Sequence, residues 1–160
     1  MRLARLVVPG VLGAAFLAGC GGHQTVSGRP SAAADITLSV RSTPALGQFI
    51  VTHNWTLYAY PPDQQRHVTC TKVEACQTAW PPLFVTAGHA VIAGPGVKKS
   101  LIGTMPGDGG RVVTYNRWPL YYYIGDRSAG VVNGQDQGLN WFVIAPNGVP
   151  NKRDLASPTG

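Results

Sequence analysis

The sequence predicts an all-β fold, in which two tandem β-hairpin or meander repeats pack into one small domain behind a disordered, lipidated N-terminal tether. Gly (20 of 160 residues) and Pro (13) are abundant enough to interrupt helices repeatedly. Four Trp, six Tyr and four Phe supply apolar surface for a core. Short runs of β-branched and aromatic residues alternate with turn residues, and this pattern occurs twice.

The internal repeat sets the organisation of the domain. Segment 56–63 (TLYAYPPD) aligns with segment 119–126 (PLYYYIGD), so that Leu, Tyr, Tyr and Asp recur at an offset of 63. Downstream, Trp80 aligns with Trp141 at an offset of 61, and short loop insertions produce such a drift. A unit of this size buries little apolar surface alone, so the two copies should pack together.

The two units are expected at 46–85 and 109–145, within a domain at 45–146, and each begins with a β-hairpin. The strands and turns are 49–52, a turn at 53–54 and 56–60 in the first unit, and 111–115, a turn at 116–117 and 120–124 in the second. A further strand, 141–144, closes the second unit, and 83–85 is the corresponding segment of the first. Residues 88–110 contain seven Gly and are expected to be mostly loop.

Successive side chains of a strand point to opposite faces, so Tyr58 and Tyr60 share one face, as do Tyr121 and Tyr123. Tyr122 should therefore face away from Tyr121 and Tyr123, which makes it the candidate for an exposed aromatic contact. The repeated motif residues are interpreted as structural, in the core or in cross-strand pairs: Tyr58, Tyr60, Asp63, Trp80, Tyr121, Tyr123, Asp126 and Trp141.

Residues 1–19 have the pattern of a secretory signal peptide. Arg2 and Arg5 precede an apolar segment, 6–17, that is too short to span a bilayer. The small residues before Cys20 resemble the lipobox of bacterial lipoproteins, in which the Cys thiol is acylated after cleavage of the signal. This resemblance implies a protein anchored by acyl chains on Cys20 in the bacterial cell membrane, on its extracytoplasmic side.

Residues 20–44 are interpreted as the lipidated Cys and a flexible tether, because Gly, Ser, Ala, Thr and Pro dominate. Residues 36–40 alternate apolar and polar side chains and could form a short strand, but the tether interpretation is preferred. Residues 147–160 are expected to be a flexible tail. Without Arg2 and Arg5 the charge is +4, and no basic run exceeds two residues, which argues against nucleic-acid binding.

Three residues could bind a metal or form a disulfide. If Cys20 is acylated, Cys70 and Cys76 form an even pair in an exported protein, which favours a disulfide. With His67, the same two thiols could instead form a Cys₂His site for copper(I) or zinc.

Asp63 and Asp126 could serve as an acid/base pair, or each could cap the turn after its strand. Their recurrence in both units favours the structural interpretation, since catalytic residues are seldom duplicated symmetrically. The sequence contains neither a Gly-x-Ser-x-Gly nor a His-Glu-x-x-His motif.

Taken together, the motifs of 46–148 resemble a bacterial family, the secreted-repeat lipoproteins of unknown function with a Tyr-x-Phe/Tyr-x-x-Asp motif. The segments that carry the resemblance are 56–60 with Asp63, the pair Cys70 and Cys76, 80–83, 113–116, 119–123 with 125–126, and Gly138 with Trp141. The resemblance implies an exported, all-β, two-repeat lipoprotein and brings no activity with it.

The expected function is that of a non-enzymatic envelope lipoprotein, without a cofactor, that binds an unknown envelope protein or a small ligand. The alternative is a copper-handling or electron-transfer accessory lipoprotein that uses Cys70, Cys76 and His67. A cell-wall hydrolase or transferase using Asp63 and Asp126 is a third hypothesis.

Overall fold

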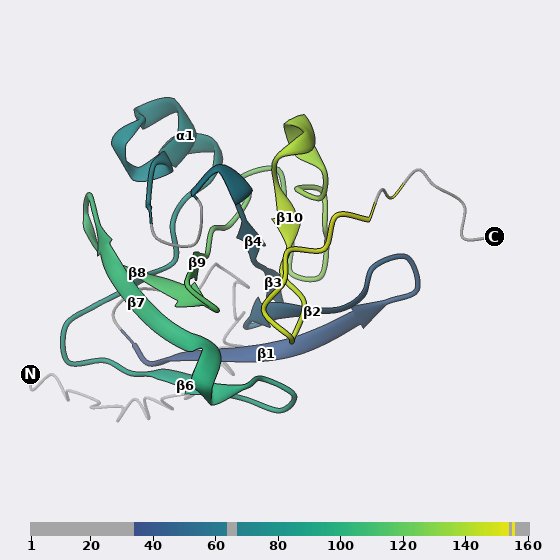
Figure 1. Cartoon of the computed structure of the whole chain (residues 1–160), viewed down its shortest axis with the longest axis horizontal. Coiled ribbons are helices and arrows are strands. Elements are labelled where there is room, and N and C mark those ends of the chain that lie inside the picture. Colours follow the sequence, from purple (N-terminus) through teal and green to yellow (C-terminus); the bar gives the residue numbers. More distant parts are fainter. Residues whose placement is uncertain (1–33, 64–66, 154, 156–160) are drawn as a thin grey trace, which may run out of the picture.

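The computed structural model describes residues 34–63, 67–153 and 155, and its regular secondary structure is mainly β-strand, as predicted. The strands are β1 (Ile36–Thr43), β2 (Gly47–Thr52), β3 (Trp55–Thr56), β4 (Tyr58–Ala59), β5 (Phe84–Val85), β6 (Val91–Ala93), β7 (Ile102–Gly107), β8 (Gly110–Tyr115), β9 (Trp118–Pro119) and β10 (Phe142–Val143). The helical segments are short: η1 (Pro61–Asp63), η2 (Cys70–Lys72), α1 (Glu74–Ala79), η3 (Lys99–Leu101) and η4 (Gln137–Leu139). Figure 1 shows α1 and β10 on the side of the molecule opposite to β1 and β6.

Each unit contains three strands in the same antiparallel order, β1-β2-β3 in the first and β7-β8-β9 in the second. One sheet has the order β3-β2-β1-β6, and the other has β5-β8-β7 with β9 also paired to β8. The predicted hairpin turns are confirmed at His53-Asn54 and Asn116-Arg117, where all four residues have positive φ between 46° and 67°. Turns of this kind match the right-handed twist of the flanking strands, which is why they suit two-residue hairpin connections.

Each unit gives its last strand to the other. β5, from the first unit, pairs with β8 of the second, and β10, from the second unit, pairs with β4 of the first. Two further backbone hydrogen bonds join the units in the same reciprocal way. Ile50 N donates to Ile144 O (2.9 Å), and Val113 N donates to Leu83 O (2.8 Å). The strand predicted at 141–144 therefore exists, but it closes the first unit rather than its own.

The interpretation of residues 36–44 as tether is wrong for β1. This strand pairs with β2 over six residue pairs and lies parallel to β6 on its other edge. Ile36 and Leu38, at 1% and 0% exposure, place their side chains in the core. The alternation of apolar and polar residues was the correct signal, and the long-range pairing with β6 makes the strand stable.

Two further segments are more ordered than expected. Residues 88–110, expected as mostly loop, include β6 and the six-residue strand β7, so the second unit begins near 102 rather than 109. Residues 147–153, expected as flexible tail, are tied down. Asn151 Nδ2 donates to Leu46 O (2.8 Å), and Ile144 bridges to Pro150. The predicted tail residues 154 and 156–160 lie outside the described part of the chain, as do the predicted signal peptide, 1–19, and the predicted lipidation site, Cys20.

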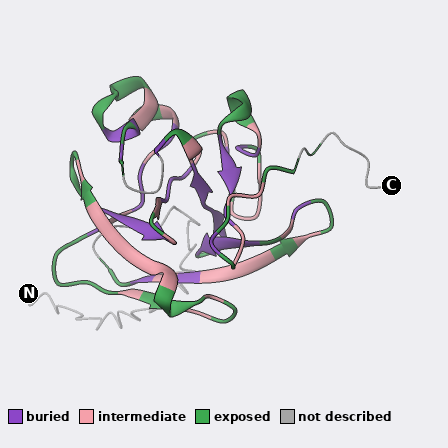
Figure 2. Ribbon diagram, viewed as in Figure 1, coloured by how far each residue is buried: buried purple, intermediate pink, exposed green. Residues whose placement is uncertain are grey.

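The core has two clusters of buried residues, and the buried segments lie mainly toward the middle of the molecule (Figure 2). Tyr58, Tyr60, Tyr121 and Tyr123 belong to one cluster and Tyr122 to the other, so the predicted alternation of faces is confirmed. The prediction of Tyr122 as an exposed contact is wrong, because its ring is 5% exposed. The predicted strand 120–124 is an extended segment after β9 with isolated bridges at Tyr121, and both of its faces are covered, which alternation alone does not reveal.

No helix among the described residues is long and apolar enough to cross a membrane.

Replacement of Leu38 by Ala tests whether β1 is part of the folded domain. Leu38 is fully buried, so Leu38→Ala should lower the free energy of unfolding by about 2–5 kcal/mol. Denaturant unfolding of residues 21–160 measures this loss. Ser42→Ala, at an exposed position of the same strand, is the control and should change stability by less than about 0.5 kcal/mol. If both variants are equally stable, β1 is not part of the folded domain and belongs to the tether instead.

Candidate functional site

The two copies of the repeated motif are in contact where Tyr58 and Tyr121 lie side by side. Their backbones exchange two hydrogen bonds, N to O, each 2.9 Å long. From this bridge the Tyr58 hydroxyl donates to Asp126 Oδ2 (2.8 Å), and the Tyr121 hydroxyl donates to Asp63 Oδ2 (2.6 Å). The Tyr of each unit is therefore bonded to the Asp of the other.

The second oxygen of each carboxylate binds its own unit. Asp63 Oδ1 accepts hydrogen bonds from the backbone N–H (3.0 Å) and the hydroxyl of Thr69, and Asp126 Oδ1 accepts from Asn133 N (2.8 Å). Both carboxylates are at most 3% exposed. Each Asp thus accepts a hydrogen bond from a backbone N–H six or seven residues later in its own unit, and its tyrosine partner in the other unit was not anticipated.

Burial raises the pKa of Tyr58 and of Tyr121 far above the ordinary value of 10.0, and the neighbouring Asp carboxylates add to this rise. Both hydroxyls therefore remain protonated and act as hydrogen-bond donors. Tyr58 also accepts a hydrogen bond from Gly134 N (3.1 Å). An acid/base role would require a carboxylate within reach of a substrate, and these two carboxylates are enclosed by hydrogen bonds to the protein.

Four aromatic rings stack in a row beside the Tyr–Asp pairs. Tyr60 stacks on Trp141 (4.4 Å between ring centroids), Trp141 stacks on Trp80 (3.8 Å), and Trp80 stacks on Tyr123 (4.3 Å). The rings alternate between the first and second unit. Tyr58 and Tyr121 meet the two Trp rings edge-on, at interplanar angles of 79° and 88°. These stacked and edge-to-face contacts bury large aromatic surfaces between the units, so the row holds the units together.

All eight repeated motif residues thus lie in one contact between the units. The signal for this was present in the sequence: the same Tyr-x-Tyr-x-x-Asp motif at equivalent positions of two units allows the units to exchange partners. The repeat alone does not show which of the two Asp carboxylates each Tyr hydroxyl bonds.

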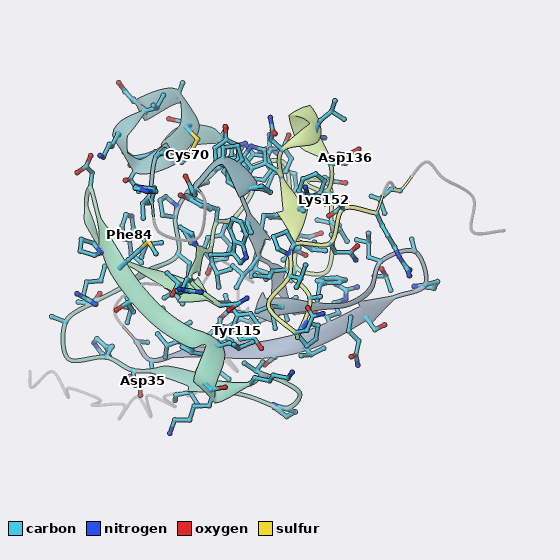
Figure 3. The ribbon with its side chains drawn as sticks, viewed as in Figure 1. Asp35, Cys70, Phe84, Tyr115, Asp136 and Lys152 are labelled. Atoms are coloured by element: carbon cyan, nitrogen blue, oxygen red, sulfur yellow. A yellow bond between two sulfur atoms is a disulfide. The ribbon has the colours of Figure 1, made fainter. Side chains whose placement is uncertain are left out.

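Cys70 and Cys76 form the predicted disulfide, with a Cα–Cα distance of 5.2 Å (Figure 3). It links η2 to α1 and closes a short loop, which on loop-closure entropy contributes about 2 kcal/mol. Since both sulfurs are in the disulfide, neither is a thiolate ligand, and the Cys₂His site with His67 is not formed. Within 34–63, 67–153 and 155, no group of three or more His, Cys, Asp or Glu side chains could hold a metal ion.

The surface is basic because two of the acidic side chains, Asp63 and Asp126, are buried. Nine Lys and Arg belong to the described residues, against six Asp and Glu, and Asp63 and Asp126 are among those six. An ion pair at the surface joins His89 Nδ1 to Asp35 Oδ1 (3.5 Å).

Cavities open at the ends of the hairpins. One of about 540 Å³ lies between the end of the β1–β2 hairpin and the C-terminal segment, beside Lys98 and Arg153. Another of about 420 Å³ lies at the end of the β7–β8 hairpin, beside Lys72 and Asp108.

The pH dependence of stability tests the Tyr–Asp exchange. A Tyr whose pKa is raised by folding stabilises the protein fully below about pH 10, and this contribution is lost as pH rises, because only the unfolded chain releases the proton. Tyr58→Phe should therefore reduce the loss of stability above pH 10 by about 1.4 kcal/mol per pH unit. Tyr121→Phe, its counterpart in the other unit, should do the same. Urea unfolding between about pH 9 and pH 11 measures the slope. A slope equal to that of the unmodified protein would contradict the assignment.

A comparison with protein families found one match, which lies in the second unit. Residues 104–145, from β7 to the end of β10, match the model of a family described as a secreted repeat of unknown function. Comparisons with curated proteins and with solved structures found no match. The matched span includes the second Tyr-x-Tyr-x-x-Asp motif and Trp141, which form half of the contact between the units. The match supports the resemblance drawn from the motif, since it covers the second copy of the repeated unit.

Proposed function

We propose that the protein is a lipid-anchored, non-enzymatic binding module of the bacterial cell envelope, which faces the extracytoplasmic side and recognises a negatively charged ligand or partner. The observation that carries the proposal is the division of the ionisable side chains. The motif carboxylates are enclosed in the contact between the units, whereas eight of the nine described Lys and Arg residues are exposed.

The enclosed motif supports a binding role over a catalytic one. Hydrolysis or group transfer by Asp63 and Asp126 would require a carboxylate to exchange protons with a substrate. Each carboxylate instead accepts hydrogen bonds at both oxygens and is almost inaccessible to solvent. The motif thus supports a scaffold that holds the hairpin ends and loops in place, and loops on a rigid scaffold commonly carry binding sites.

The secreted family and the lipobox-like segment together support the location. With the domain beginning at β1, the segment between Cys20 and Ile36 contains 15 residues. A flexible chain of that length spans about 20 Å. Acyl chains on Cys20 would therefore hold the domain close to the membrane surface.

The charge of the outer surface supports an anionic ligand or partner. Without the two buried aspartates, nine Lys and Arg face four Asp and Glu in the described part of the chain. A surface with an excess of one charge attracts ligands of the opposite charge and repels others.

Cell fractionation tests the anchor. The unmodified protein should remain in the membrane fraction until detergent is added. Cys20→Ser, which removes the acylated thiol, should leave the membrane fraction and become soluble. Cys76→Ser is the matched control, because it removes a different cysteine and should stay in the membrane fraction. If Cys20→Ser stays there as well, the acyl anchor is wrong.

Calorimetric titration of residues 21–160 tests the charge preference. Pyrophosphate and citrate should bind, and their affinity should fall between about 50 and 200 mM NaCl because salt screens surface charges. Glucose, a neutral control, and spermidine, a cationic one, should not bind. Binding of the neutral or cationic probe in place of the anions would overturn the proposed preference.

A further inference from the structure

The cavity at the end of the β1–β2 hairpin differs from the rest of the basic surface. It is a shallow pocket of about 540 Å³ that is open to solvent. One wall is the hairpin end, 46–48, and another is the C-terminal segment, 145–153, which runs beside β2 in Figure 1.

Two cations and several amide groups line this cavity. Lys98 comes from the connection between β6 and η3, and Arg153 comes from the C-terminal segment. Gln48, Asn147 and Asn151 add side-chain amides. No Asp or Glu of the described residues is part of the lining, so the two positive charges are not neutralised within the cavity wall.

A buried tyrosine positions the Lys98 side of the cavity. The Tyr115 hydroxyl accepts a hydrogen bond from Lys98 N (3.0 Å) and donates one to Pro146 O (2.8 Å). Tyr115 is fully buried and lies at the end of β8 (Figure 3). One rigid side chain therefore fixes the backbone of Lys98 relative to the C-terminal segment.

A buried glutamine positions the Arg153 side. Gln135, 6% exposed, donates from Nε2 to Asn151 O (2.8 Å) and to Arg153 O (2.7 Å), while its Oε1 accepts from Val143 N (2.9 Å). The backbone beneath both cations is thus held before any ligand arrives. Preorganisation of this kind reduces the ordering cost of binding.

The first unit lacks the positioning tyrosine. Thr52 stands where the second unit has Tyr115, because each residue directly precedes the two-residue turn of its hairpin. The cavity at the β7–β8 hairpin end combines Lys72 with Asp108 and His67, so its lysine has a carboxylate in the same lining. The cavity with two cations is therefore specific to one side of an otherwise repeated structure.

We propose that this cavity is a binding site for a small polyanion, a molecule with two or more carboxylate or phosphate groups, which Lys98 and Arg153 contact at separate anionic groups. A guanidinium can hold a carboxylate or phosphate through two parallel hydrogen bonds, and an ammonium adds a compact charge. The inference rests on the proposed function and specifies where and what the module binds.

The test is titration of pyrophosphate and of citrate into residues 21–160 and its variants. Lys98→Ala and Arg153→Ala should each weaken binding of at least one probe about tenfold or more, as expected for loss of a charged hydrogen bond. Lys72→Ala is the matched control: it removes the same charge at the other hairpin cavity and should change affinity by less than about twofold. All three side chains are exposed, so the variants should fold, which circular dichroism verifies. Amide NMR shifts should move at Gly47, Gln48 and Asn147.

Three outcomes overturn the site. If the unmodified protein binds neither probe, the proposed anion preference fails together with the cavity. If it binds but Lys98→Ala and Arg153→Ala bind equally well, the cavity fails while the general preference stands. If Lys72→Ala weakens binding as much as Lys98→Ala, the attraction is a diffuse surface effect.

Discussion

The reciprocal bonding of Tyr58 with Asp126 and of Tyr121 with Asp63 is the interaction on which the structure depends. A buried carboxylate is stable only when its oxygens are hydrogen-bonded, and here each one needs donors from both units. The same contact aligns the backbones of the two tyrosines and brings the two Trp rings together. Neither unit can satisfy its own aspartate alone, so the motif couples the units chemically as well as by packing.

The sequence reveals local structure better than long-range pairing. The hairpin turns, the alternating tyrosines, the disulfide and the all-β class follow from patterns within short windows, and the structure agrees with them. β1 was missed although its alternation was visible, because its partner β6 lies about 50 residues away and carries no distinctive pattern of its own. The exchange of β5 and β10 between units was missed for the same reason: a repeat shows that two units exist, not which strands they share.

The site illustrates a limit of motif reasoning. Tyr-x-Tyr-x-x-Asp drew attention because it repeats, and the structure uses it for the contact between the units. The polyanion cavity involves Lys98, Tyr115, Gln135 and Arg153, which lie in four separate segments and form no motif. Duplicated residues build the symmetric scaffold, whereas residues that differ between the units supply the chemistry of one face.

The exchange of strands between the units also governs how the chain can mature. Asp63 is translated well before its partner Tyr121, and β4 well before its partner β10. The first unit therefore cannot be completed until nearly the whole domain has been synthesised. Contacts of this sequence separation make folding slow and concerted. A chain cut short before residue 121 would leave a buried-type carboxylate and a sheet edge without partners. Such a fragment lacks half of the contact between the units, so the first unit should not fold as an independent domain.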